Sequence, residues 1–336
     1  MKAIKSISLA LIISLSGCFK IFNKDEYEFT YETIVTESPV NLVNINSYFD
    51  DYNSNLPYPG FFHGIYFSTN RNSFGKNFDI IYKGLNITYH RKDDILNISY
   101  FHDANIKNNY TSKVLKTINT DFDEYGPFHF FGAKDYEYFF YANNESGNFD
   151  IKYVSSKKSD FGTYNGQEII NAPESFTSIN SAHDDYYPSI FNGNKSLVFS
   201  SNREKEIFNI YETAFMEDEI NPTYKIDLEH EIKKNAVLSS DQNDKCPFVL
   251  GNIMVFASDR EGGYGGFDLY FSQYLNGKWS QPQNMGEKIN SAYDEYRPVI
   301  IEFGELEDTM LIFSSNKPGG KGGYDLYAAR TKVLPK

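Results

Sequence analysis

The sequence predicts an all-β protein, a five-bladed β-propeller built from four-stranded antiparallel blades. The first observation is a motif that recurs five times and ends in a strand opened by Asp or Asn. That residue falls at positions 79, 150, 209, 268 and 325, so the spacings are 71, 59, 59 and 57. A fixed period of this length is typical of an array of equal units. The second observation is that each unit contains strand-like runs separated by turn residues.

The repeat that begins at Asp294 shows the order of elements. The acidic turn Asp294-Glu295 and a following Pro introduce a short strand. Residues 312–316, Ile-Phe-Ser-Ser-Asn, form an apolar run typical of a buried strand. Residues 319–323, Gly-Gly-Lys-Gly-Gly, are expected to form a hairpin turn, and Tyr-Asp-Leu-Tyr at 324–327 supplies the next strand. In the preceding repeat, residues 277–280 indicate a fourth strand. Because one sheet cannot bury both faces alone, the repeats must stack around an axis.

The ring must also close. Residues 26–42 are expected to provide the outer strand of the last blade, which removes the free sheet edges. The stretch between the first two repeats is longer than the others and contains an apparent hairpin, residues 87–90 with 95–100. A sixth, degenerate blade at that hairpin is the alternative to five.

Three motifs in residues 184–330 resemble a known repeat family. They are Phe-Ser-Ser-Asn-Arg at 199–203, Gly-Gly-x-Gly-Gly-(Tyr/Phe)-Asp-Leu-Tyr at 262–270 and 319–327, and Ile-Asn-Ser-Ala-Tyr-Asp-Glu at 289–295. These motifs are similar to PD40, or WD40-like, repeats, which are related to the propeller of the periplasmic protein TolB. Such repeats are frequent in envelope proteins of Bacteroidota. The first half departs from the pattern: it lacks the glycine-rich turns. At position 209 Asn replaces Asp.

The first residues resemble a bacterial lipoprotein signal. Lys2 and Lys5 precede an apolar segment, residues 7–15, that is too short to span a bilayer as a mature anchor. Leu-Ser-Gly-Cys at 15–18 is similar to a lipobox, which implies cleavage before Cys18 and acylation of that residue. Acyl chains give stable attachment without a spanning helix. The expected organisation is a signal peptide at 1–17, a lipidated tether at 18–25 and the propeller at 26–333. We expect an outer-membrane lipoprotein and leave open whether it faces the periplasm or the cell surface.

Composition excludes some partners. The chain has 32 basic and 45 acidic residues, a formal net charge of −13. An acidic surface argues against nucleic acid and against anionic headgroups as partners. Besides Cys18 the chain contains only Cys246, so no disulfide framework is expected and Cys246 is predicted to be a buried thiol. The 27 Tyr and 29 Phe residues suit a propeller core, and exposed Tyr also suits contact with protein or glycan.

Acidic residues recur just before each innermost strand, where propeller geometry should bring them to one end of the central channel. A ring of acids there could bind a cation or a basic peptide. The alternative, which recurrence in several repeats favours, is that they cap turns and bond neighbouring blades. These candidate channel-rim acids are Asp123, Glu124, Asp184, Asp185, Asp244, Asp294 and Glu295.

A second set of repeat residues is expected to be structural. Its acids are predicted to bridge turns and to pair with arginines of the preceding strand. The acids are Asp79, Asp150, Asp268 and Asp325, and the arginines are Arg71, Arg203 and Arg260. The glycine-rich loops lack the strand–loop–helix context of a phosphate site and fit hairpin turns better.

Catalytic and metal signatures are absent from the sequence. The six histidines have no metal-ligand spacing, and there is no Gly-x-Ser-x-Gly motif. We therefore expect no catalytic residue, metal or cofactor, although a cation in the channel stays open. The first hypothesis is a non-enzymatic, protein-binding scaffold subunit of an envelope complex, with outer-membrane or envelope proteins as partners. The second is a surface glycan-binding lipoprotein, and the third is a five-bladed propeller glycoside hydrolase with a carboxylate pair.

Overall fold

The structure of the protein is a computed structural model. It describes residues 29–57, 64–101, 110–132, 136–157, 169–214, 231–302 and 308–333. The predicted signal peptide, Cys18 and the tether lie outside these residues. Among the described residues, no helix has the length and apolar character needed to cross a membrane.

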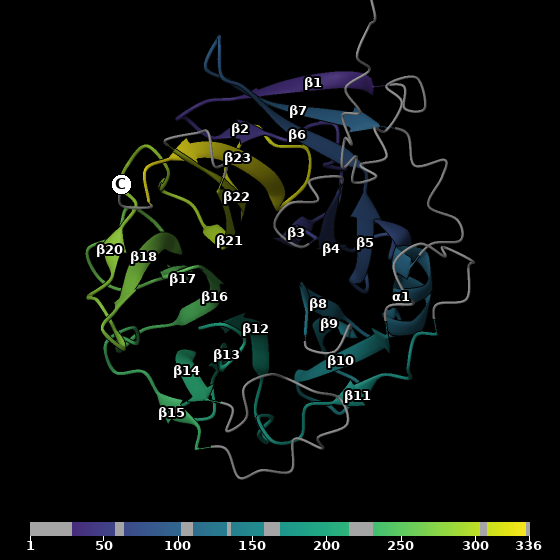
Figure 1. The fold of residues 1–336 in the computed structure, drawn as a ribbon, viewed down its shortest axis with the longest axis vertical. Coiled ribbons are helices and arrows are strands. Elements are labelled where there is room, and N and C mark those ends of the chain that lie inside the picture. The colour runs from purple at the N-terminus through teal and green to yellow at the C-terminus, as the bar shows by residue number, and fades with distance from the viewer. Residues whose placement is uncertain are drawn as a thin grey trace, which may run out of the picture.

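Five antiparallel sheets surround a central axis, which confirms the predicted five-bladed propeller (Figure 1). Blade 1 consists of β3 (Asp51–Asn55), β4 (Ile65–Thr69) and β5 (Asp79–Lys83). Blade 2 consists of β8 (Glu124–Phe131), β9 (Tyr136–Asn143), β10 (Asp150–Lys157) and β11 (Glu174–Ser175). Blade 3 consists of β12 (Asp185–Phe191), β13 (Ser196–Ser201), β14 (Asn209–Ala214) and β15 (Lys233–Lys234). Blade 4 consists of β16 (Asp244–Leu250), β17 (Ile253–Ser258), β18 (Asp268–Leu275), β19 (Lys278–Trp279) and β20 (Gln283–Asn284). Blade 5 consists of β21 (Glu295–Glu302), β22 (Thr309–Ser315), β23 (Asp325–Thr331) and β2 (Val40–Asn41).

The second strand of each blade carries most of the core. Every residue of β17 and of β22 is buried, because each strand is covered on both faces by neighbouring blades. This explains why these strands read as continuous apolar runs and not as alternating ones. The innermost strands, β3, β8, β12, β16 and β21, contact one another in turn around the axis.

The N-terminal segment closes the ring as expected, but with only two residues. β2 pairs with β23 in blade 5, with Val40 opposite Ala328 and Asn41 opposite Tyr327. The preceding strand, β1 (Phe29–Val35), does not continue this blade. It pairs instead with β7 (Ile95–Phe101), which in turn pairs with β6 (Leu85–His90).

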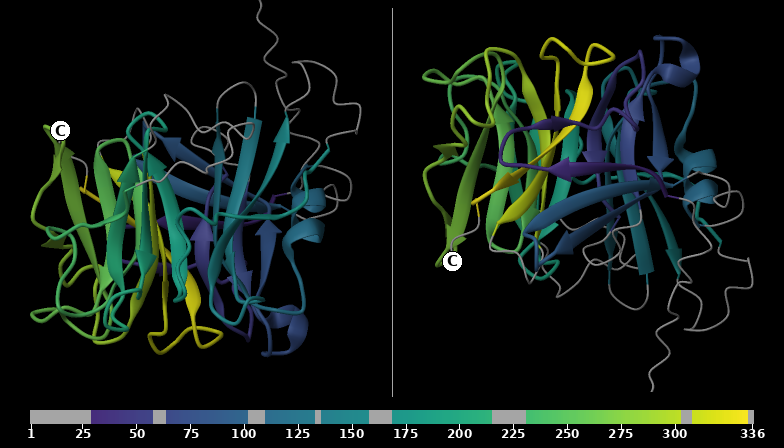
Figure 2. Two further views of the ribbon diagram at one scale, coloured as in Figure 1. Left: turned by 90° about the horizontal axis from the view of Figure 1, so that it is seen from below. Right: turned by 90° about the horizontal axis from the view of Figure 1, so that it is seen from above.

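The sheet β1–β7–β6 therefore corrects the six-blade alternative. Its strands form no part of the ring and lie outside β2 and β23, as the right-hand view of Figure 2 shows. Leu85, Leu96 and Ile98 share a core cluster with Leu326 and Ala328 of blade 5. The insertion thus covers the junction at which the ring closes. The helix α1 (Tyr110–Ile118) follows it and buries Val114 and Ile118 against blades 1 and 2.

Each innermost strand is interrupted by a β-bulge two residues after it begins. At each bulge one residue has a positive φ, which costs free energy for residues other than glycine. Bulges re-aim side chains, and here the same irregularity occurs in all five blades. The residues concerned are Asn53 (58°), Gly126 (60°), Tyr187 (54°), Cys246 (59°) and Arg297 (47°).

Candidate functional site

The main concave site is a funnel at one mouth of the central channel, with a volume of about 350 Å³. Almost all of its wall is aromatic. The residues lining it are Asp50, Tyr52, Phe78, Tyr125, Tyr186, Tyr187, Lys245, Phe267, Tyr296 and Tyr324.

Two rings of side chains build the funnel, and each ring takes one residue from each blade. The inner ring comes from the second residue of each innermost strand, directly before the bulge. Its members are Tyr52, Tyr125, Tyr186, Lys245 and Tyr296. The outer ring comes from the residue just before the third strand of each blade. Its members are Phe78, Phe149, Phe208, Phe267 and Tyr324, of which Phe78, Phe267 and Tyr324 line the hollow.

Aromatic side chains of the inner ring pack against those of the outer ring, some face to face and some edge to face. Tyr125 stacks on Phe149 with ring centroids 4.8 Å apart and planes 11° apart. Phe267 meets Tyr296 edge-on at 5.2 Å, and Tyr52 stacks on Tyr324 at 5.6 Å. Such contacts add to the free energy of burial and hold the rings in fixed positions.

Burial governs the chemistry of the funnel tyrosines. It raises the pKa of Tyr125, of Tyr186 and of Tyr324 well above the ordinary phenol value. Their hydroxyl groups therefore stay protonated at neutral pH and can donate hydrogen bonds.

The bulge residues lie beneath the funnel, and of these Tyr187 lines it. The guanidinium carbon of Arg297 lies 5.2 Å from the centroid of the Tyr187 ring. Arg297 also donates a hydrogen bond from Nη2 to the carbonyl oxygen of Pro127 at 3.2 Å. Cys246 is a free, fully buried thiol, and burial raises its pKa to about 11.

The first acid of each acidic pair bonds one blade to the next. Asp123, Asp184 and Asp294 are half-buried. Asp184 Oδ1 accepts the backbone N–H of Phe149 at 2.9 Å, and Asp294 Oδ1 accepts that of Phe267 at 2.9 Å. Asp123 does the same for Phe78. Each acid therefore positions an outer-ring aromatic residue.

The second acid of each pair is buried inside its own blade. Asp185 accepts hydrogen bonds from the backbone N–H and hydroxyl of Ser181, and Asp244 does so from Ser240. Glu295 is held in the same way by Ser291. These acids do not line the channel.

Among the described residues, Glu124 and Glu295 lack the arginine that pairs with the innermost acid in the three other blades. Glu124 is held by Thr120 and Asn143, and Glu295 by Ser291 and Ser315. Burial raises the pKa of Glu124 to about 7. None of the seven candidate rim acids is therefore among the residues that line the funnel. Asp50, which does line it, is absent from that candidate set.

The predicted pairing between the second set of acids and the arginines is wrong. Arg203 donates to Asp185 at 2.6 Å, on the innermost strand of its own blade, and not to a residue that opens a third strand. Arg71 pairs likewise with Asp51, and Arg260 with Asp244. The arginine lies over aromatic rings of its blade and reaches the innermost strand, because the acid there is fully buried and requires a counter-charge.

The four acids expected to bridge turns make local bonds. Asp79 accepts from Asn72, and Asp150 accepts from Ser146. Asp268 accepts the backbone N–H of Tyr264 at 2.8 Å. Asp325 accepts the backbone N–H of Gly322 at 3.0 Å. The glycine-rich loops are hairpin turns, as expected, with φ of +88° at Gly262 and +94° at Gly319.

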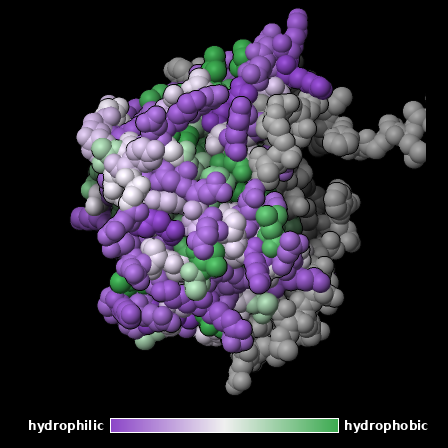
Figure 3. Space-filling model, turned by 90° about the vertical axis from the view of Figure 1, so that its left-hand side faces the viewer, coloured by the Kyte–Doolittle hydropathy of each residue, from purple (hydrophilic) through white to green (hydrophobic). Residues whose placement is uncertain are grey.

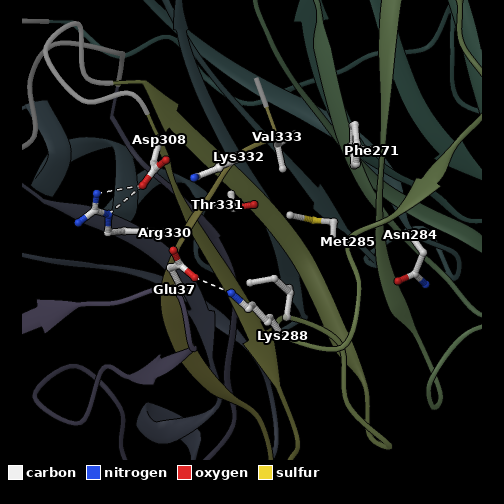
Figure 4. A pocket seen from close by; sticks show the side chains of 11 residues that line it. Glu37, Phe271, Asn284, Met285, Lys288, Asp308, Arg330, Thr331, Lys332 and Val333 are labelled. Carbon is white, nitrogen blue, oxygen red and sulfur yellow. Dashed lines mark hydrogen bonds and ion pairs between the residues drawn. The ribbon is translucent and has the colours of Figure 1, made fainter. Parts of the chain in front are cut away.

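A second hollow, of about 330 Å³, lies between blades 4 and 5 (Figure 4). Met285, Phe271 and Val333 form its apolar part. Four of its five charged lining residues form ion pairs: Lys288 bonds Glu37 at 2.6 Å, and Arg330 bonds Asp308 at 2.9 Å. The fifth, Lys332, forms none within the described residues. A hollow whose charges are mostly neutralised offers less to a ligand than the funnel does. In the part of the chain that the structure describes, no group of three His, Cys, Asp or Glu side chains could hold a metal ion.

Comparison with known proteins gives a fold likeness. No protein-family model matches the chain, and no curated protein does. Among solved structures, it is similar to an α-L-arabinofuranosidase of Podospora anserina in complex with cellotriose, with 13% identity and a TM-score of 0.50 over 88% of this chain and 96% of that one. An endo-arabinase of Bacteroides thetaiotaomicron gives 12% identity and a TM-score of 0.49, covering 90% and 98% of the two chains. The GH62 α-L-arabinofuranosidase catalytic domain of Coprinopsis cinerea gives 11% and 0.49, covering 90% and 97%.

The likeness corrects the first functional hypothesis. The similar solved structure with a TM-score of 0.50 is an α-L-arabinofuranosidase, which contradicts the expectations of a non-enzymatic scaffold subunit, of no enzymatic activity and of a protein-interaction role. At 13% identity the likeness establishes a shared fold, five-bladed in both.

The aromatic rings are missing from the candidate residues that the sequence supplied. A signal was present, because Tyr follows the acidic pair in four repeats and Phe or Tyr precedes the third strand in all five. The sequence pattern alone does not distinguish a residue that faces the channel from one that faces the core.

Proposed function

We propose that the protein is a carbohydrate-active propeller that holds a glycan against the aromatic funnel and hydrolyses glycosidic bonds. The aromatic funnel itself is the observation that carries the proposal. It is a fixed concave wall of half-buried rings at the mouth of the channel, with a few polar groups among them.

A glycan fits this chemistry. The apolar C–H face of a sugar ring stacks on an aromatic face, and its hydroxyl groups need hydrogen-bond partners at the rim. The tyrosines supply both, because each has an apolar ring and a phenol that remains a donor at neutral pH. Pockets lined mostly by aromatic side chains with a small number of polar groups are typical of small-molecule sites.

Two carboxylates are our candidates for the hydrolytic step. Glycoside hydrolysis normally needs one carboxyl group as acid and a second as nucleophile or base, on either side of the bond. Asp50 and Asp294 lie at the two ends of Tyr324. Asp50 accepts the backbone N–H of Tyr324 at 2.8 Å, and Asp294 accepts its hydroxyl at 2.8 Å. We assign these two residues as the carboxylate pair, with Asp50 in the funnel wall, Asp294 behind it at the hydroxyl of Tyr324, and the glycosidic bond held over Tyr324.

The fold and the surface agree with this assignment without deciding it, since one fold serves many functions. The similar arabinofuranosidase is described in complex with cellotriose. The outer wall visible in Figure 3 is largely hydrophilic, and its apolar residues are scattered. That wall offers no broad apolar patch of the kind that marks a protein-binding surface.

The test measures binding and hydrolysis separately on the same panel of polysaccharides. Binding is measured by the retardation of the full chain in gels that contain each polysaccharide, and hydrolysis by the release of reducing ends. Tyr125→Ala and Tyr324→Ala should weaken retardation. Tyr48→Ala, which removes an 85% exposed tyrosine that does not line the funnel, should not.

The hydrolytic step has its own variants. Asp50→Asn and Asp294→Asn keep an oxygen that can accept the same N–H group and remove the carboxylate. They should abolish the release of reducing ends while retardation persists. Retardation of the wild-type chain without any release of reducing ends would contradict hydrolysis and leave glycan capture alone. The absence of retardation by any polysaccharide would contradict both parts.

Anchoring remains part of the same proposal. Acylation of Cys18 would hold the propeller at the outer membrane, where extracellular or periplasmic glycans are accessible. Labelling of the wild type, but not of Cys18→Ser, with a radioactive fatty acid in the native cell checks this.

A further inference from the structure

One member of the inner aromatic ring breaks its symmetry. Four blades contribute Tyr, and blade 4 contributes Lys245. Its ammonium nitrogen lies 3.7 Å from the centroid of the Phe208 ring and 5.8 Å from that of Phe267. Lys245 is half-buried, and burial lowers its pKa. Among the residues that the structure describes, no carboxylate lies within ion-pair distance of it.

A second cation lies one layer deeper. Arg297 is fully buried, with a relative exposure of 0%. Its single hydrogen-bond partner within the described ranges is the carbonyl oxygen of Pro127. The Nε and Nη1 atoms of Arg297 are buried without any partner there. Burial lowers the pKa of Arg297, and the titratable groups around it are the thiol of Cys246 and the phenols of Tyr187 and Tyr296.

The arginines that follow the second strands of blades 1, 3 and 4 differ from Arg297, because each has a carboxylate partner. Arg71, Arg203 and Arg260 each face a buried aspartate of their own blade. A buried cation without a counter-charge costs several kcal/mol of folding free energy. The chain has 45 acidic residues, yet none is placed against Arg297 in the described part. Lys245 and Arg297 are close enough that both act on the thiol of Cys246.

We infer that the funnel binds an anionic glycan, and that the ammonium group of Lys245 pairs with the carboxylate of a uronic acid unit while Arg297, buried beneath the funnel, adds positive charge. This inference rests on the proposed function and names its substrate class. The aromatic rings hold the apolar faces of the sugar units, and the two cations select those that carry a carboxylate. Pairing of a charged donor with a carboxylate in a half-buried site is stronger than a neutral hydrogen bond.

The experiment compares charged and uncharged forms of the same polymer. Retardation of the full chain is measured in gels that contain polygalacturonate or alginate, each next to its esterified, neutral form, at physiological ionic strength. The variant is Lys245→Tyr, which restores the residue of the other four blades. Lys245→Gln is the second variant, and thermal unfolding verifies that each is folded. Lys288→Gln is the matched control, because it removes one positive charge at an exposed site outside the funnel.

The wild type should bind at least one acidic polymer about tenfold more tightly than its ester, which corresponds to one charge-assisted contact. Both Lys245 variants should lose that preference, and Lys288→Gln should keep it. Equal binding of acidic and esterified forms would overturn the inference and leave the proposed function standing. Preference that survives in both Lys245 variants would also overturn it. The absence of binding to every polymer, neutral ones included, would overturn the inference and the proposed function together.

Discussion

Asp50 accepts the backbone N–H of Tyr324 at 2.8 Å, and this bond joins the first blade of the propeller to the last. The same bond occurs at the four other junctions, each time between the residue before an innermost strand and an outer-ring aromatic residue. The acceptor at one of these junctions is an amide, Asn243, which accepts the N–H of Phe208 at 3.1 Å. An uncharged amide oxygen therefore suffices as the acceptor in this bond.

Replacement of Asp50 should therefore depend on what remains at the position. Asp50→Ala leaves the N–H of Tyr324 without its partner at the ring closure, and should lower the free energy of unfolding by about 1–3 kcal/mol. Asp50→Asn, which copies Asn243, should cost less than half of that. Chemical denaturation monitored by tyrosine fluorescence measures both values. Equal losses in the two variants would show that the charge of Asp50, and not its oxygen, holds the junction.

Gly126 is the one glycine among the five bulge residues. A Cβ atom at this position would lie 2.4 Å from a ring carbon of Tyr187, which lines the funnel. Gly126→Ala should therefore displace Tyr187 and weaken glycan binding as well as stability. Gly251→Ala is the control, because Gly251 has nearly the same φ, +59° against +60°, and nothing within 4 Å of the added atom. Thermal unfolding should show a larger loss for Gly126→Ala, and equal losses would mean that φ alone sets the cost.

The arginine–aspartate pairs inside the blades should matter far more than the exposed ones. Arg203 bonds Asp185 at 2.6 Å, and Lys288 bonds Glu37 at the same distance on the surface. Arg203→Met leaves Asp185 buried with no counter-charge and should cost about 3–5 kcal/mol. Lys288→Met should change the free energy of unfolding far less, because water solvates Glu37. Denaturant titrations of both variants test the difference, and similar costs would contradict the role of burial.

Glu124 should make stability fall as the pH rises. Burial raises its pKa from 4.5 to about 7 in the folded protein. Between these values the carboxyl group is ionised only in the unfolded chain, so deprotonation favours unfolding in that window. Its stabilising contribution is complete below about pH 4.5, declines as the pH approaches 7, and is absent above that pH.

Glu124→Gln should flatten the pH dependence of the unfolding free energy between pH 4.5 and 7. Glu145→Gln is the control, because the hydrogen bond from Lys152 lowers the pKa of Glu145, and its contribution is lost towards acid pH. Denaturation at a series of pH values distinguishes the two. An unchanged slope in Glu124→Gln would mean that Glu124 is ionised in the folded protein.

Much of the fold could be predicted because the repeat fixes it locally. The fully buried second strands, such as β17 and β22, read as apolar runs, and the turns at Gly262 and Gly319 carry the residues that positive φ requires. The closing strand was placed correctly at the last blade, although only Val40 and Asn41 form it. The hairpin of β6 and β7 could not be placed, because its alternating pattern suits a sixth blade and an outer sheet equally well.

The candidate site was only partly accessible from the sequence. The acidic pairs stood out, but the sequence did not separate Asp184, which bonds the neighbouring blade, from Asp185, which is buried within its own. Adjacent residues in a strand face opposite sides of the sheet, so two acids that are neighbours in the sequence have different surroundings and different roles. The partner of Arg203 was missed because it lies on the innermost strand, which precedes Arg203 in the chain, and not on the third strand, which follows it.

The sequence by itself determined the repeat, the number of units and the class of fold, because these depend on the order of strands and turns along the chain. The tertiary structure decided which residues face the axis. Five bulges turn Tyr187, Arg297 and their equivalents inward, and ring closure brings Asp50 to Tyr324 and Asp294. Residues that are distant in sequence converge only when the ring closes, and for that reason the funnel has no signature within any one repeat.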